Sequence, residues 1–319
     1  MTTVRRSFLR SLFRIKRYRT NFKKLQKDRI KYAPRRLPER RPRALSCPPP
    51  ATSNQLWNRL KKPQQTFNQD QSLFSRLPPE IRRLIWFKVL GGRLLHIARV
   101  TKKLLAVDCF HDVGPDLYTR YHSCWGVTPL HISNPTLGFF YNNGPRDKQE
   151  SLLPLLQTCR RIYIETTPIL YEENTFDINH LDTVLYLRQS VLPQRLNQIR
   201  VVNFTWCFRW DPATTPAPWD FATWRETCNI LAGFSRLQEL TMHLDGSYLE
   251  ESELETLRPI KPAKKFDVGL PWSEDKCGQM EKENGYPFRL ISEAESPVGN
   301  LCSIPTNIMV DVGPGEDII

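Results

Sequence analysis

Two closely spaced cysteine–histidine pairs are the residues in this sequence best suited to metal chemistry. Cys109 and His111 are separated by one residue, and so are His122 and Cys124. Thiolate and imidazole groups suit zinc, and residues two apart share one face of a strand. The spacing is tighter than the usual gaps of two to four residues, so the pairs can equally be unrelated ends of a turn-rich loop. We therefore assign no metal and no cofactor.

No motif of a known catalytic mechanism is present. The sequence has no G-x-S-x-G elbow, no H-E-x-x-H helix, no P-loop and no dinucleotide fingerprint. Four further histidines, His96, His131, His180 and His243, stand in no recognised pattern with carboxylates or thiols. The sequence thus identifies no catalytic residue, and we predict that the protein is not an enzyme.

Charge divides the chain into an arm and a body. The net charge is +13, but residues 1–62 contain 20 basic and only 2 acidic side chains. Residues 63–258 are close to neutral, with 20 basic and 21 acidic side chains, and residues 259–319 contain 6 basic and 10 acidic ones. This distribution excludes a folded domain that is itself a basic nucleic-acid module, while a basic arm that binds a partner stays open.

The arm has several interpretations. Apolar residues recur at helical spacing between Val4 and Leu25, which indicates a basic amphipathic helix. Such a helix can contact nucleic acid, serve as a mitochondrial presequence or lie on a membrane surface, or it can be a solvated disordered arm. The segment 34–43, PRRLPERRPR, resembles a nuclear-import signal. We predict a basic disordered arm over residues 1–70 of an intracellular protein, in the nucleus or cytoplasm, with the mitochondrion as the alternative.

The body, residues 71–258, is predicted to be one mixed α/β domain. The element 72–92 contains a helix that begins near Pro78 and Pro79 and is stopped by Gly91 and Gly92. It precedes a β-hairpin over 93–110, and a second amphipathic helix runs through 152–170. Strands and helices then alternate, which favours parallel pairing through right-handed crossovers in units similar to leucine-rich repeats. Residues 259–319 are predicted to be a mostly disordered acidic tail. The chain has no stretch of about 20 apolar residues, so we predict no transmembrane segment.

Two motifs in the body resemble the halves of an F-box. The first comprises Leu77, Pro78, Pro79, Glu80 and Ile81, with Ile85 one helical turn later, and it resembles the L-P-x-E-(I/L) opening of that domain. The segment 152–163, LLPLLQTCRRIY, resembles the second helix. About sixty residues of hairpin and loop separate the two motifs, whereas an ordinary F-box has them almost adjacent.

The whole layout is similar to a large fungal family of domains of unknown function. Members of that family begin with LPPE(I/L)R, continue into a hairpin and then carry a longer signature. In this chain the residues that match the signature are Leu155, Cys159, Arg160, Ile162, Glu165, Ile169, Leu170, Tyr171, Asn174 and Phe176. On their chemistry alone these residues are expected to be structural, with Cys159 a packed thiol and Asn174 a side chain that bonds the helix end or the turn.

The resemblance implies a protein-interaction role. An F-box-like start implies a substrate-recruiting subunit of a cullin-type ubiquitin ligase that binds a Skp-type adaptor through Leu77–Ile81 and Ile85. We therefore predict a non-enzymatic protein-interaction module. The alternative is a nucleus- or nucleic-acid-associated protein that acts through residues 1–62.

Overall fold

The computed structural model of the chain describes residues 27, 30–31, 33–39, 71–100, 102–109, 153–208 and 217–294. In these ranges the strands are β1 (Leu94–Val100), β2 (Lys103–Asp108), β3 (Thr175–Ile178), β4 (Val201–Cys207), β5 (Glu239–Asp245), β6 (Lys265–Leu270) and β7 (Arg289–Ser292). The helices are α2 (Leu73–Arg76), α3 (Pro79–Leu90), α4 (Leu153–Leu156), α5 (Arg160–Glu172), α6 (Leu181–Ser190), α7 (Pro193–Leu196), α8 (Phe221–Ala232), α9 (Glu251–Glu255) and α10 (Glu274–Asn284).

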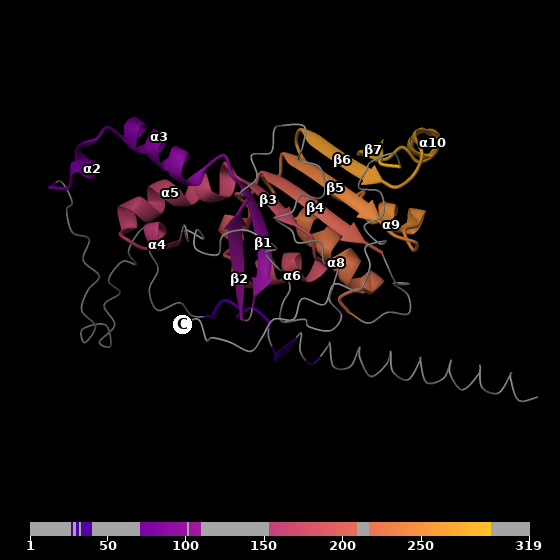
Figure 1. Ribbon diagram of the computed structural model, residues 1–319, viewed down its shortest axis with the longest axis horizontal. Helices are drawn as coiled ribbons and strands as arrows, with labels where there is room; N and C mark the ends of the chain where they lie inside the picture. The colour runs from indigo at the N-terminus through magenta and orange to yellow at the C-terminus, as the bar shows by residue number, and fades with distance from the viewer. Residues whose placement is uncertain are drawn as a thin grey trace, which may run out of the picture.

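Seven strands form one sheet in the order β2-β1-β3-β4-β5-β6-β7, and only the β1–β2 pair is antiparallel (Figure 1). From β3 to β7 each strand pairs in parallel with the next one in the chain. The predicted hairpin is confirmed, and its first strand continues the parallel sheet by pairing with β3. The hairpin therefore forms one end of the sheet. The predicted mixed α/β class is confirmed.

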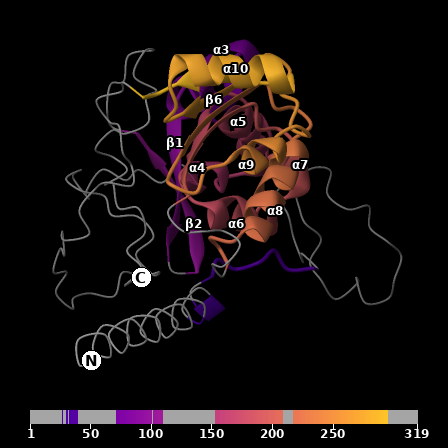
Figure 2. The same cartoon turned by 90° about the vertical axis from the view of Figure 1, so that its right-hand side faces the viewer.

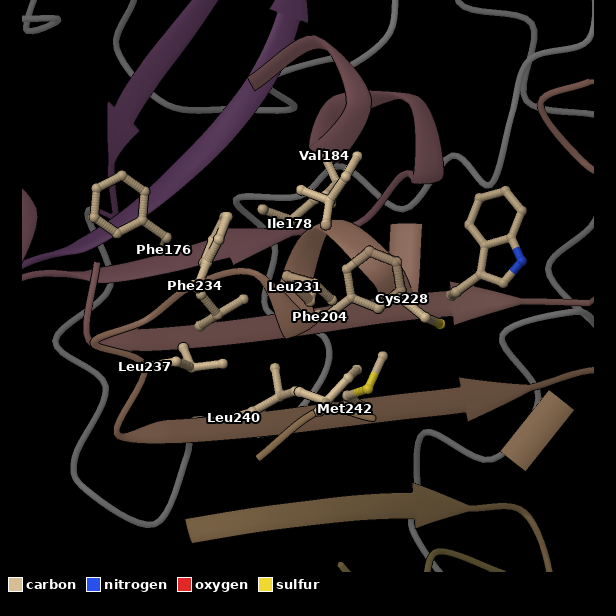
Figure 3. Packing of buried hydrophobic residues seen from close by; sticks show 14 of the residues in the cluster. Phe176, Ile178, Val184, Phe204, Cys228, Leu231, Phe234, Leu237, Leu240 and Met242 are labelled. Atoms are coloured by element: carbon tan, nitrogen blue, oxygen red, sulfur yellow. The ribbon is translucent and has the colours of Figure 1, made fainter. Parts of the chain in front are cut away.

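The helices that connect the parallel strands lie on one face of the sheet. Figure 2 shows α6, α8 and α9 together on one side of the strands. Alternate strand residues point toward these helices, because successive side chains of a strand face opposite ways. Phe204 of β4 and Met242 of β5 are fully buried there, with Val184 of α6 and Leu231 of α8 (Figure 3). The opposite side of the sheet, here called the open face, carries the intervening and mostly polar strand residues.

The prediction of a disordered tail from residue 259 needs correction, because β6, α10 and β7 complete the sheet. These elements give weak sequence signals: β6 and β7 are short, and α10 buries only Cys277 and Met280. Pairing with β5 stabilises β6, and β6 in turn stabilises β7. The folded domain therefore extends at least to residue 294.

Side chains of α10 also reach the outer edge of the sheet. The backbone N–H of Leu290 in β7 donates to the carboxylate of Glu281 in α10. At the other side of β7 the N–H of Glu293 donates to the carbonyl of Leu270, at 2.8 Å. One backbone donor of the last strand is thus occupied by a side chain from its own domain.

A short part of the basic arm packs on the domain. Residues 33–39 have no regular secondary structure, and the N–H of Arg35 donates to the carbonyl of Lys102 and that of Leu37 to the carbonyl of Gln189. The Ser190 hydroxyl donates to the Arg35 carbonyl at 3.1 Å. Residues 34–39 of the segment that resembles an import signal therefore contact α6 and the hairpin turn through their backbone. Most of residues 1–70 lies outside the described residues, and the predictions for the arm stay predictions.

Candidate functional site

Helix α3 carries the first F-box-like motif and has two contrasting faces. It begins at Pro79, where the missing N–H of proline leaves no helical hydrogen bond unmade, and it ends before Gly91. Arg82, Trp86 and Leu90 recur every fourth residue on the inner face, and all three are buried. This face packs against α5 (Figure 1). Because these three residues define the buried side of α3, the residues between them form its outer side.

The inner face is locked by an ion pair that joins the two motifs. The Nε of Arg82 lies 3.2 and 3.1 Å from the two carboxylate oxygens of Glu165 in α5, and Nη2 lies 2.9 Å from Oε1. The indole N–H of Trp86 donates to Glu165 Oε2 at 3.0 Å, and Nη1 of Arg82 donates to the carbonyl of Leu77. Bidentate geometry of this kind is the strongest form of an ion pair. It brings the two motifs together although 83 residues separate Arg82 from Glu165.

The same contacts change the acidity of Glu165. Burial alone would raise the pKa of Glu165, but the hydrogen bonds from Arg82 and Trp86, together with the charge of Arg82, outweigh it and lower the pKa. A carboxyl group whose pKa is lower in the folded state stabilises the fold above its unfolded pKa, about 4.3 for Glu. That contribution is lost as the pH falls through the folded pKa.

We therefore expect the free energy of unfolding to fall between about pH 5 and pH 3, partly through Glu165. Urea unfolding measured at several pH values gives this slope. In Glu165→Gln, which cannot titrate, the loss over the same pH range should be smaller than in the wild type. An identical slope in the two proteins would contradict the assignment.

The outer face of α3 is apolar and exposed. Ile81 is 43% exposed, Leu84 64% and Phe87 44%. The exposed basic side chains of Arg83 and Lys88 lie on the same helix. A few isolated apolar side chains on a surface need no explanation, but several on one helix face indicate an interaction site.

The residues predicted to bind a partner stand at the start of this helix. Glu80 and Ile81 are exposed in its first turn, and Ile85, one turn further on, is half-buried. Of the six residues, Leu77 and Pro78 directly precede α3, Pro79, Glu80 and Ile81 are in its first turn, and Ile85 is in its second turn. Leu77 and Ile85 are half-buried and the other four are exposed.

The signature residues of α5 lie at positions that define its ends. Cys159 is the N-cap of α5, and its sulfur accepts a hydrogen bond from the N–H of Ile162 at 3.4 Å. Leu155 and Ile162 are partly buried against the core, and Arg160 is half-buried in the first turn. The cysteine of the signature therefore has a position in the helix start that a hydroxyl or carboxylate side chain usually holds.

Asn174 joins three elements by hydrogen bonds. Its Nδ2 donates to the carbonyl of Leu90 at 2.7 Å and to that of Leu170 at 2.9 Å, which are the ends of α3 and α5. Its Oδ1 accepts from the N–H of Arg93, just before β1, at 2.8 Å. All three partners are backbone groups, so one buried amide satisfies the termini of two helices and the entry to the sheet.

The two aromatic residues of the signature pack together beside Asn174. The rings of Tyr171 and Phe176 are stacked, with centroids 6.0 Å apart. Burial raises the pKa of Tyr171 to about 12. The tyrosine therefore stays neutral at physiological pH and takes part in packing.

Several interacting residues were absent from the sequence prediction. Arg82 and Trp86 could have been found from their spacing of four with Leu90, which marks a buried helix face. Two buried histidine–carboxylate pairs on the open face gave no sequence signal, because their members are 50 or more residues apart: His96–Asp177 at 2.8 Å and His243–Glu293 at 2.9 Å.

The predicted cysteine–histidine set is only partly described. Cys109 directly follows β2, where its backbone N–H donates to the carbonyl of Leu94 at 2.9 Å, whereas Cys207 in β4 is disulfide-bonded. The other members of the set, His111, His122 and Cys124, lie outside the described residues. In the part of the chain that the structure describes, no three His, Cys, Asp or Glu side chains are grouped as a metal site. No helix there is long and apolar enough to cross a bilayer.

The fold and this site define an α/β domain that has a mostly parallel sheet and, at one end, a helix pair with an exposed apolar face. The chain belongs to the family described as a domain of unknown function, DUF7730, which matches residues 67–289. The match covers both motifs and six of the seven strands completely. No curated protein and no solved structure matches the chain.

Proposed function

We propose that the chain is a non-enzymatic protein-interaction module that docks a partner on the outer face of α3, as an F-box-like adaptor subunit does. The observation that carries this proposal is the exposed apolar group of Ile81, Leu84 and Phe87 on a helix whose other face is locked by Arg82 and Glu165. A helix fixed in this way offers its outer side chains in one arrangement, so less conformational entropy is lost on binding.

The contact between α3 and α5 supports the F-box-like interpretation. Adaptor binding requires a compact surface to which both halves contribute, and the two halves here are distant in sequence. The Arg82–Glu165 pair brings them into contact. The partner of this surface would be a Skp-type adaptor.

The sheet domain would then bind the protein that the ligase modifies. Strands β3 to β7 follow one another in chain order with their helices on one side, an arrangement similar to leucine-rich repeats. Repeats of this kind bind partners over an extended surface. In a ligase subunit, α3 would contact the adaptor while the sheet domain holds the substrate.

Leu84→Glu should weaken binding of a purified Skp-type adaptor at least tenfold. The substitution places a charge in the apolar contact, and truncating or charging a central anchor costs about 2 kcal/mol or more. Calorimetry with the full chain measures the dissociation constant. Because Leu84 is 64% exposed, the free energy of unfolding should change by less than about 0.5 kcal/mol.

The matched control is Tyr248→Glu, at an exposed aromatic side chain of the loop before α9. That variant should bind the adaptor as the wild type does. If the wild-type chain fails to bind, or if Leu84→Glu binds as tightly as Tyr248→Glu, the docking surface has been assigned to the wrong place.

A further inference from the structure

A histidine on the open face of the sheet has an arrangement that the docking proposal does not use. Leu240, Met242 and Leu244 of β5 point into the hydrophobic core, so His243 faces the other way. It lies near the carboxyl end of the strand, where parallel α/β sheets commonly bind ligands. The side chain is nevertheless buried, with 9% of the residue exposed.

Glu293, which follows β7, holds this imidazole in place. Its Oε1 lies 2.9 Å from Nδ1 of His243. The carboxylate reaches this position across Gly269 of β6, the register partner of His243. A Cβ added to Gly269 would lie 1.8 Å from Glu293 Oε1, so any larger residue at this position would displace the carboxylate.

The carboxylate decides which nitrogen carries the proton. A carboxylate accepts hydrogen bonds, so the Nδ1 that faces Glu293 carries a proton, and in the neutral tautomer of this kind Nε2 has a lone pair. That Nε2 is buried and has no hydrogen-bond partner among the described residues. An unsatisfied buried polar atom costs about 1–3 kcal/mol. An acceptor that is oriented, desolvated and unpaired is suited to a ligand that brings a donor.

The residues around His243 indicate which kind of hydrogen-bond donor a ligand would bring. The register partner of His243 on β4 is Thr205, a neutral hydroxyl residue. The nearby carboxylate of Asp267 is already paired with Lys265 at 3.1 Å and with Arg289 at 2.9 Å. Within the described ranges no three metal-ligating side chains are grouped. These neighbours fit a neutral hydroxyl group better than a metal ion or a charged ligand.

We propose that His243, oriented by Glu293, is the hydrogen-bond acceptor of a binding site for a neutral hydroxylated small molecule on the open face of the sheet. Nε2 accepts the ligand hydroxyl, and Gly269 allows the supporting carboxylate to approach. This site is independent of α3, so its test does not depend on adaptor binding.

The test is nitrogen NMR of the full chain labelled with ¹⁵N-histidine. The nitrogen shifts of the His243 ring should show the tautomer that carries the proton on Nδ1. Glycerol, glucose and myo-inositol are the probes, and at least one of them should shift the Nε2 resonance in a saturable way. Loss of the resonance in His243→Leu assigns it to this residue.

Variants separate ligand binding from structure. Glu293→Gln and Gly269→Ala should each weaken the bound probe at least tenfold and change the tautomer ratio of His243. The matched control is His96→Leu, which breaks the other buried pair on the same face and should leave the probe affinity unchanged. The proposal is overturned if no probe shifts Nε2, if Nε2 bonds only an ordered water, or if the His243→Leu protein binds the probe with wild-type affinity.

Discussion

Replacing Arg82 by alanine should lower the free energy of unfolding by about 3 kcal/mol. The guanidinium is buried and contacts both oxygens of Glu165, which is also bonded to Trp86. Its removal leaves a partly buried carboxylate that has lost its main counter-charge, and this accounts for most of the loss. Urea unfolding followed by circular dichroism measures the change.

The matched control for this substitution is one residue away. Arg83→Ala removes the same side chain type from the exposed side of α3, where its contact with Glu173 is 3.6 Å long. Surface pairs contribute little, so this variant should lose less than about 1 kcal/mol. A double-mutant cycle of Arg82→Ala with Glu165→Ala should show coupling above about 1 kcal/mol. Equal losses at positions 82 and 83 would contradict the role given to the buried pair.

Asn174→Ala is expected to destabilise the domain by about 3 kcal/mol as well. The substitution leaves the N–H of Arg93 and the carbonyls of Leu90 and Leu170 without this partner. Each unsatisfied buried group costs about 1–3 kcal/mol. Because Asn174 joins the ends of α3 and α5 to the start of β1, the loss should appear in the cooperative unfolding transition.

Two further substitutions test whether the loss in Asn174→Ala comes from the hydrogen bonds of the amide group. Asn174→Asp keeps an acceptor for Arg93 but cannot donate to the two carbonyls, so it should be at least as destabilising as alanine at pH 7. Asn203→Ala, at a half-buried asparagine of β4, serves as the control and should cost less than about 1 kcal/mol. A loss of less than 1 kcal/mol in Asn174→Ala would show that the turn is held by other contacts.

The strong local patterns of the sequence were sufficient to predict most elements. The runs LLHIARV and KLLAVD, separated by a polar turn, predicted the hairpin. The alternation of strands and helices that begins at Asn174 predicted the parallel units. The signals failed for β6 and β7, which have only six and four residues, and for α10, which buries only Cys277 and Met280. Those elements are stabilised by their neighbours in the sheet, which a local pattern does not report.

The site was predicted only in part, for a related reason. The apolar start of α3 and the signature of α5 could be quoted residue by residue from the sequence. The pairing of Arg82 with Glu165 and of His243 with Glu293 spans 83 and 50 residues. Such pairs depend on the order of strands and on the packing of helices, so only the folded chain brings them together.

The contact between Glu281 and the N–H of Leu290 has a consequence for the behaviour of the protein in solution. The edge strand of a sheet has unpaired backbone groups. A strand of another chain can pair with them, and repeated pairing of this kind gives open-ended polymers. An acidic side chain bonded to that edge both occupies a donor and repels an incoming carbonyl. Glu281 therefore opposes the pairing of a further strand at Leu290, because it occupies the backbone donor that such a strand would use.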